Sequence, residues 1–163
     1  MLRSSSCLLA AVLFGAGLAY AAEPKADEIK LSKDEQRILD LTNEARAKEK
    51  LPPLKVNATL LKAARAHSAN MAKQQKMEHV LDDKNPAQRV EKAGYDYASV
   101  GENIAWGDKG ASVDTIFKGW MDSKVHRENI LSPKFDEIGL GTATDDKGEI
   151  YYPQDFGKKR PKS

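Results

Sequence analysis

The hydrophobic residues of this chain repeat at a spacing of three and four in several stretches, each of which follows a polar residue able to cap a helix. The sequence SKDE at residues 32–35 is a capping box in front of the first stretch, which Pro52 and Pro53 cannot continue. Asn85-Pro86 opens a shorter helix that Gly94 ends. The pattern predicts four helices, which begin near residues 32, 57, 85 and 112 and end near residues 50, 73, 94 and 121.

Three shorter stretches are typical of strands, at residues 99–105, 137–144 and 149–156. The last two are joined by the sequence DDKG, which favours a turn. Pro153 interrupts the third stretch. Because proline cannot donate a hydrogen bond to a neighbouring strand, we expect it at a bulge or on a sheet edge. A small sheet with helices packed on it predicts the α+β class.

Residues 1–21 have the layout of a secretory signal, with a basic start at Arg3, an apolar stretch over residues 7–20 and small residues before Ala22. The apolar stretch is short and rich in small residues. We therefore expect cleavage before Ala22 and no transmembrane span afterwards, an uncleaved anchor being the alternative. The protein is expected to be secreted or periplasmic.

The remaining residues suffice for one domain. We expect a polar lead-in at residues 22–31, the domain at 32–157 and a basic tail at 158–163, which contacts an anionic envelope surface or is solvated. The one cysteine, Cys7, lies in the expected signal. Packing rather than disulfides must then hold the domain, and neither a Cys nucleophile nor Cys-ligated zinc is expected. The formal net charge of +2 gives no argument for a nucleic-acid partner.

The chain has three histidines, His67, His79 and His126, and each lies in a different segment. Two imidazoles and a carboxylate can bind a divalent metal ion and leave coordination positions open, or they can act as general acid and base. Close ligand spacings such as HExxH are absent. Any shared site must therefore be assembled by the fold from distant segments.

Six motifs follow one another along the chain: AHSANMA, a histidine shortly after the second predicted helix, GENIAWG, GWMDSKVHRENIL, FDEIGLGTA and YYPQDFG. Their order and spacing over roughly residues 36–157 resemble the bacterial SCP-like form of the CAP superfamily (cysteine-rich secretory proteins, antigen 5, pathogenesis-related 1). The resemblance implies a three-layer α-β-α sandwich with a small, mainly antiparallel sheet. It also implies a cleft with a His and Glu tetrad that can bind Zn²⁺ or another divalent metal.

By this resemblance His79, Glu102 and His126 line the cleft and are the expected metal ligands. Ser123 stands where the family has its fourth ligand, a Glu, so the resemblance implies at most a triad. The residues expected around the triad are Ser123, Asn103 and His67. No organic cofactor is expected.

Other readings of these residues remain open. His67 falls on the apolar side of its helix, where a buried imidazole hydrogen-bonded to its neighbours is the alternative to a cleft residue. Asn129 is expected to cap or bridge a turn. Arg127 is expected to pair with Glu102 or Glu128, or to reach solvent.

Three functions follow as alternatives. The first is a binding module for an extracellular ligand, which would be a lipid, a glycan or wall fragment, or a protein. The second is a metal-dependent hydrolase in which His79, Glu102 and His126 activate water. The third is a structural or stress-related envelope protein whose triad stabilises the fold. No nucleophile with its base can be identified in the sequence, which favours the binding module. Whether the protein is an enzyme, and its oligomeric state, stay open.

Overall fold

The computed structural model describes residues 29–161, so the predicted signal at residues 1–21 lies outside the described range. The elements in chain order are α1 (Lys33–Lys48), β1 (Lys55–Val56), α2 (Ala58–Gln74), α3 (Pro86–Lys92), β2 (Tyr97–Gly107), α4 (Val113–Asp122), α5 (Lys124–Ile130), β3 (Glu137–Leu140), β4 (Ala143–Thr144) and β5 (Ile150–Lys159).

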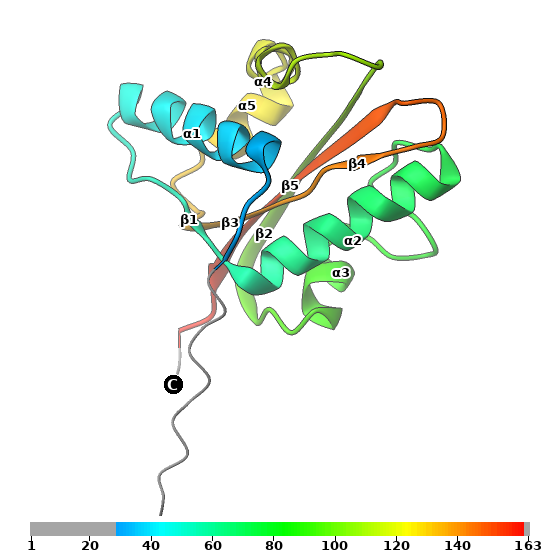
Figure 1. The fold of residues 1–163 in the computed structure, drawn as a ribbon. Coiled ribbons are helices and arrows are strands. Elements are labelled where there is room, and N and C mark those ends of the chain that lie inside the picture. The colour runs from blue at the N-terminus through cyan, green and yellow to red at the C-terminus, as the bar shows by residue number, and fades with distance from the viewer. Residues whose placement is uncertain (1–28, 162–163) are drawn as a thin grey trace, which may run out of the picture.

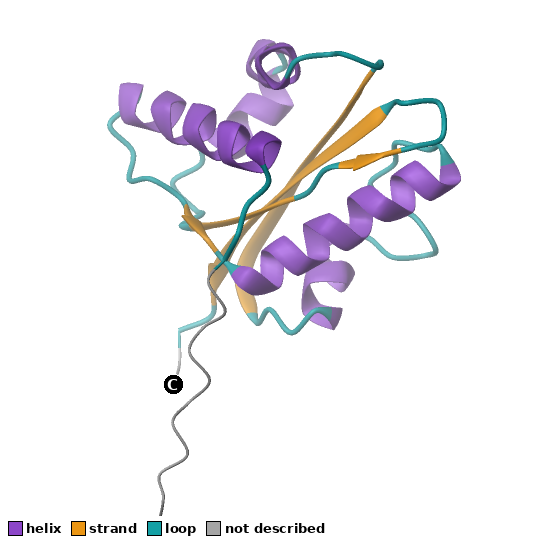
Figure 2. Cartoon of the chain, viewed as in Figure 1, coloured by secondary structure: helices purple, strands orange, loops and turns teal. Residues whose placement is uncertain are grey.

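The strands form one sheet in the order β1-β3-β5-β2, and β4 pairs with β5 beside this path. The β2–β5, β3–β5 and β4–β5 pairs are antiparallel, whereas β1 and β3 run parallel. Helices α1, α4 and α5 cover one face, and α2 and α3 cover the other (Figures 1 and 2). This arrangement confirms the expected α-β-α sandwich with a small, mainly antiparallel sheet.

The four predicted helices are confirmed together with their caps. The Ser32 hydroxyl accepts a hydrogen bond from the Glu35 N–H, and the Glu35 carboxylate accepts one from the Ser32 N–H. Asn85 forms a second capping box in front of α3, whereas the side chains of Asn57 and Ser112 only accept hydrogen bonds from the first N–H groups of α2 and α4. A left-handed Gly94, with φ of 99°, follows α3. These local signals are strong because each satisfies backbone N–H groups that a helix start leaves unpaired.

The sequence did not predict α5. Ser123 precedes this helix in an extended conformation and its side chain makes no capping hydrogen bond. Its seven residues carry one buried position, Ile130, and Val125 is 68% exposed. A helix so short, with so little apolar surface, leaves no periodic pattern to detect.

The strands differ from the prediction in three places. The stretch 137–144 is divided into β3 and β4. β5 continues to Lys159, so the expected domain boundary at 157 falls inside a strand, and Arg160 donates to the Asp96 carboxylate rather than lying free. Pro153 is not on an edge strand, because β5 is central. It lies opposite Gly141, between β3 and β4, where the Gly141 N–H donates to the Pro153 carbonyl and the proline nitrogen gives no bond in return, so the break between the two short strands falls at this proline.

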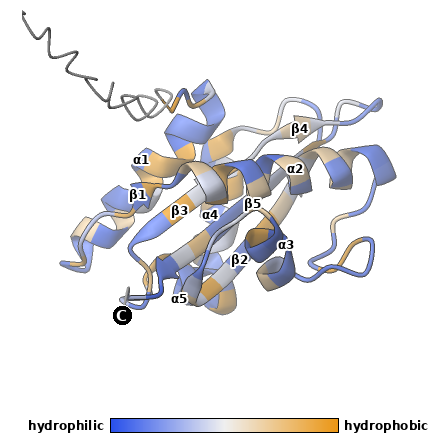
Figure 3. Cartoon of the chain, turned by 90° about the horizontal axis from the view of Figure 1, so that it is seen from below, coloured by the Kyte–Doolittle hydropathy of each residue, from blue (hydrophilic) through white to orange (hydrophobic). Residues whose placement is uncertain are grey.

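The largest apolar core lies between the sheet and the layer of α1 and α4, where Ile38, Trp120 and Ile138 are buried. Hydrophobic residues of α1 and β3 face one another across this layer, whereas α3 is mainly hydrophilic (Figure 3). Trp120 donates its indole N–H to the Ile104 carbonyl. No helix within residues 29–161 combines the length and the apolar character needed to cross a bilayer.

Two features hold the helices of the outer layers in place around the sheet. The buried guanidinium of Arg46 on α1 donates to the carbonyls of Pro52, Ile130, Ser132 and Phe135. On the other face, a Cβ at Gly139 would lie 2.1 Å from the Leu60 carbonyl carbon, and one at Gly141 would lie 2.6 Å from the Ala64 oxygen. Only glycine lets α2 approach the sheet this closely.

Candidate functional site

Glu102 is the centre of the candidate site. Its neighbours along β2, Gly101 and Asn103, lie next to Asn129 of α5, on the face of the sheet that α5 covers. Because side chains alternate along a strand, Glu102 points to the opposite face, under α2 and α3. Its side chain is only 1% exposed. Asp155 is its cross-strand partner on β5. The sheet therefore places two carboxyl groups side by side beneath the helices.

Both oxygens of Glu102 are engaged. Oε1 lies 2.6 Å from Nδ1 of His79, in the loop after α2, and Oε2 accepts from the guanidinium of Arg89 on α3. Arg89 also donates to the carbonyls of His79, at 2.7 Å, and Lys84, at 2.8 Å. Burial raises the pKa of Glu102, but the His79 hydrogen bond and the Arg89 charge together bring it below the ordinary value. Glu102 is therefore an ionised carboxylate that joins β2 to α3 and to the loop.

His67 on α2 lies beneath this cluster. It is 1% exposed, and its Nε2 is 3.7 Å from Oε2 of Glu102, beyond hydrogen-bond distance. Neither ring nitrogen has a hydrogen-bond partner within the described residues. Burial lowers the pKa of His67 to about 4, so the imidazole is neutral at pH 7. The burial of His67 is confirmed, whereas the expected hydrogen bonds to its neighbours are not formed.

Asp155 is a second buried group without a partner. It is fully buried, and neither carboxyl oxygen has a hydrogen bond within residues 29–161. Burial, and then the charge of Glu102, raise the pKa of Asp155 well above the usual value. Burial and the neighbouring Glu102 carboxylate therefore both favour the protonated form of Asp155, which can share its proton with Glu102.

His126 lies on α5, at the edge of the sheet that β2 forms. Its backbone carbonyl accepts from the Asn103 side chain at 3.0 Å. Burial, and then the charge of His79, lower the pKa of His126. The electrostatic influence of His79 therefore reaches the His126 ring, although no contact joins that ring to Glu102 among the described residues.

The residues expected around the triad have mainly structural contacts. The Ser123 hydroxyl makes no hydrogen bond within the described chain. Asn129 does not bridge a local turn. It donates to the Glu102 carbonyl and to the Asn103 side chain, at 3.2 and 2.9 Å, and so fixes α5 on β2. Arg127 donates to the Met121 carbonyl rather than to Glu102 or Glu128.

Sequence reasoning missed Arg89 and Asp155. Arg89 is one basic residue in a short polar helix, and its approach to Glu102 depends on how α3 folds back over β2. Asp155 faces Glu102 only through the register of β2 with β5. Neither contact can be predicted from a local sequence pattern.

This arrangement does not fit a metal ion. Within residues 29–161 no three His, Cys, Asp or Glu side chains are grouped so that they could hold one. Glu102 has both oxygens engaged, and the Arg89 guanidinium at the same carboxylate repels a divalent cation. The metal that the resemblance implies at His79, Glu102 and His126 is therefore not favoured by these contacts, and zinc titration tests it directly.

A family model, that of the CAP or cysteine-rich secretory protein family, matches residues 39–156. The uncharacterised protein YkwD of Bacillus subtilis is 38% identical over 125 residues, which are 76% of this chain and 47% of YkwD. The chain thus spans about half the length of this relative.

Two solved structures are similar in fold. An outer surface protein from Borrelia burgdorferi superposes with a TM-score of 0.74 at 23% identity, over 81% of this chain and 97% of that one. An extracellular protein with an SCP domain from Bacillus anthracis superposes with a TM-score of 0.69 at 29% identity, over 77% of this chain and 40% of that one.

Proposed function

Because the chain belongs to the CAP family of cysteine-rich secretory proteins, we propose that it acts outside the cytoplasm as a ligand-binding module, secreted or associated with the envelope. Proteins of similar structure include an outer surface protein and an extracellular protein. The secretory layout of residues 1–21 supports the same location. The partner is an extracellular ligand, and no nucleic acid is expected.

The hydrogen bonds that Glu102 already makes favour a binding function over a catalytic one. A general base must reach a nucleophile or a water, and a metal needs free ligand atoms. Both Glu102 oxygens are instead held by His79 and Arg89. The Ser123 hydroxyl has no hydrogen bond to a base within the described residues. These contacts support a site that holds its loop and helix in place, with the half-exposed His79 at its border.

Titration with zinc chloride tests this choice. We expect no saturable zinc binding at micromolar concentration by calorimetry. We also expect the same background hydrolysis of labelled casein and p-nitrophenyl acetate from wild type, His79→Ala and His126→Ala, with or without zinc. Stoichiometric zinc binding together with zinc-dependent turnover, both lost in the two variants, would establish the hydrolase instead.

Fractionation tests the location. The full chain, expressed with its own N-terminus in a bacterial host, is expected in the periplasmic or extracellular fraction. Its intact mass should correspond to a chain that begins at Ala22. Recovery of uncleaved protein in the cytosol would contradict the proposal. Uncleaved protein in the membrane fraction would point to an N-terminal anchor.

A structural role for the same cluster is the second candidate, because Glu102 and Arg89 together connect β2, α3 and the loop at residues 75–85. Thermal unfolding with and without EDTA separates two versions of this role. An unchanged melting temperature indicates that the side chains alone stabilise the fold, whereas a decrease with chelator indicates that a metal contributes.

A further inference from the structure

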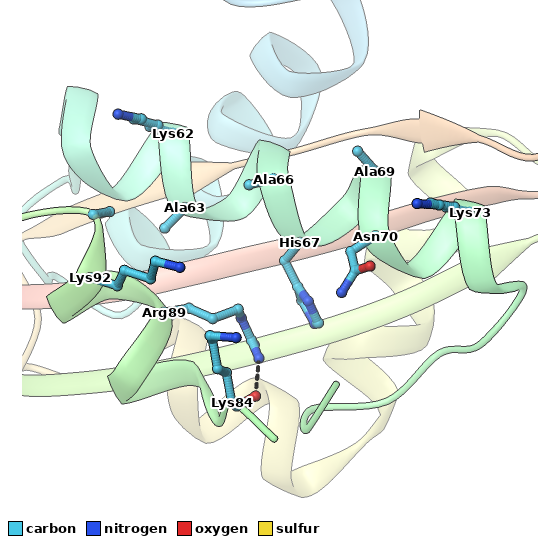
Figure 4. A pocket seen from close by; sticks show the side chains of 11 residues that line it. Lys62, Ala63, Ala66, His67, Ala69, Asn70, Lys73, Lys84, Arg89 and Lys92 are labelled. Atoms are coloured by element: carbon cyan, nitrogen blue, oxygen red, sulfur yellow. Dashed lines mark hydrogen bonds between the residues drawn. The ribbon is translucent and has the colours of Figure 1, made fainter. Parts of the chain in front are cut away.

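A pocket of about 590 Å³ lies between α2 and α3, next to the Glu102 cluster (Figure 4). Small-molecule sites in proteins usually have volumes of about 300–1,000 Å³. One wall is a stripe of small residues on α2, namely Ala63, Ala66 and Ala69. The pocket is therefore large enough for a ligand, and its alanine wall offers a smooth apolar surface.

The remaining lining is strongly cationic. It contains Lys62, Lys73, Lys84, Arg89 and Lys92, and it contains no acidic side chain. None of the four lysines forms an ion pair with the described residues. The four ammonium groups are therefore available to a bound anion, although Asp82 lies near Lys73 and Lys84 and offsets part of their charge.

The base of the pocket has an unsatisfied polar group. His67 is 1% exposed, lines the pocket and lacks a partner for either ring nitrogen. In Figure 4 its side chain leaves α2 and lies between that helix and Arg89. A buried imidazole without a partner is unusual. Its ring N–H is a donor beneath the floor of the pocket, and a negative oxygen would reach it only after the side chains that cover it move apart.

The spacing of the cations limits the size of the ligand. Lys62 and Lys73 are eleven positions apart on one helix, which corresponds to roughly 16 Å at about 1.5 Å per residue. Lys84 and Arg89 lie between these ends in Figure 4. A single inorganic phosphate cannot contact both ends, whereas a molecule with two or more negative groups can contact several of these cations at once.

We propose that this pocket binds an anionic ligand with two or more oxyanion groups, phosphate or carboxylate. The negative oxygens lie at the lysines and the carbon skeleton lies along the alanine stripe. The proposal rests on the binding function proposed above and adds the chemical class of the ligand. The anion is either a free molecule or the headgroup of a lipid, and the two arms of the test distinguish these sources.

The test uses the full chain and two probes: inorganic pyrophosphate, measured by calorimetry, and vesicles that contain cardiolipin, whose headgroup region carries two phosphates, measured by sedimentation against pure phosphatidylcholine vesicles. The first variant combines Lys73→Gln, Lys84→Gln and Lys92→Gln. Its matched control combines Lys55→Gln, Lys134→Gln and Lys147→Gln, which remove the same charge outside the pocket. The second variant, Ala66→Phe, fills the pocket at an exposed helix position without changing the charge.

We expect saturable binding of one probe. It should weaken at least tenfold in the triple pocket variant and in Ala66→Phe, and stay within twofold of wild type in the control. Binding of pyrophosphate assigns a free anion, and binding of cardiolipin vesicles alone assigns a lipid headgroup. Equal weakening in the control, full binding by Ala66→Phe or no saturable binding in either arm overturns the proposal. If the zinc titration and the fractionation give the expected results, such an outcome rejects the proposed ligand of this pocket but leaves the proposed function in place.

Discussion

Replacing Arg89 by glutamine tests the central contact of the site. The change removes the guanidinium from a carboxylate that is 1% exposed and lies beside Asp155. His79 still bonds Oε1, but Oε2 loses its charged donor, and the neutral His67 ring at 3.7 Å does not replace it. Removing one partner of a buried ion pair typically costs about 3–5 kcal/mol, because the other charge stays buried. The carbonyls of His79 and Lys84 lose their donors in addition.

A double-mutant cycle isolates the interaction energy between Arg89 and Glu102. Glu102→Gln leaves the Arg89 guanidinium with two carbonyl acceptors, so we expect a smaller loss of about 2 kcal/mol. The double variant pairs two neutral amides, and its loss should be below the sum of the single losses by about 1–2 kcal/mol. The same contacts hold the pKa of Glu102 below its ordinary value of 4.5. The contribution is therefore complete above that value and is lost as the pH falls through the folded-state pKa.

The measurement is urea unfolding at pH 7, with Arg37→Gln as a control. Arg37 also donates two hydrogen bonds to a carboxylate, that of Asp114, but the two side chains are 45% and 56% exposed. Removing Arg37 should cost far less than removing Arg89, because water screens an ion pair between two exposed side chains. A coupling energy below about 0.5 kcal/mol between Arg89 and Glu102, or equal losses at Arg89 and Arg37, would refute the reasoning.

Three further predictions concern stability. The pKa of His67 is about 4 in the folded protein and 6.5 in the unfolded chain, so the unfolded chain takes up a proton first as the pH falls. The free energy of unfolding should therefore decrease by about 2 kcal/mol between pH 7 and 5. Urea unfolding of His67→Gln at the same pH values should not show this decrease. Arg46→Met removes the donor of four backbone carbonyls and should cost at least about 3 kcal/mol, so a loss below 1 kcal/mol in urea contradicts this role. Gly139→Ala places a methyl group against α2 and should lower the melting temperature, whereas Gly119→Ala, in open space on α4, should raise it slightly.

The sequence predicted those parts of the fold that depend on local signals. The caps at Ser32, Asn57, Asn85 and Ser112 satisfy backbone groups within three residues, and all four are present. The short helix α5 was missed because it is held by Asn129 reaching across to β2, which is a contact between distant segments.

The candidate site divides in the same way. The motifs identified His79 and Glu102, and the fold brings their side chains within 2.6 Å of each other. The partners that set the chemistry, Arg89 and Asp155, come from the packing of α3 and from strand register. A carboxylate that is already paired with a guanidinium behaves differently from a free one. The identity of the histidine and glutamate residues in a cleft therefore does not by itself determine what the cleft binds.

The position of β5 has a consequence for the order in which the fold forms. This strand pairs with β2, β3 and β4, yet within the described chain it is the last element to be synthesised. Until its residues emerge, the other strands have only the two-residue parallel pair of β1 and β3 to hold them together. The nascent polypeptide therefore cannot close its sheet early, and its apolar faces stay uncovered until β5 has been synthesised.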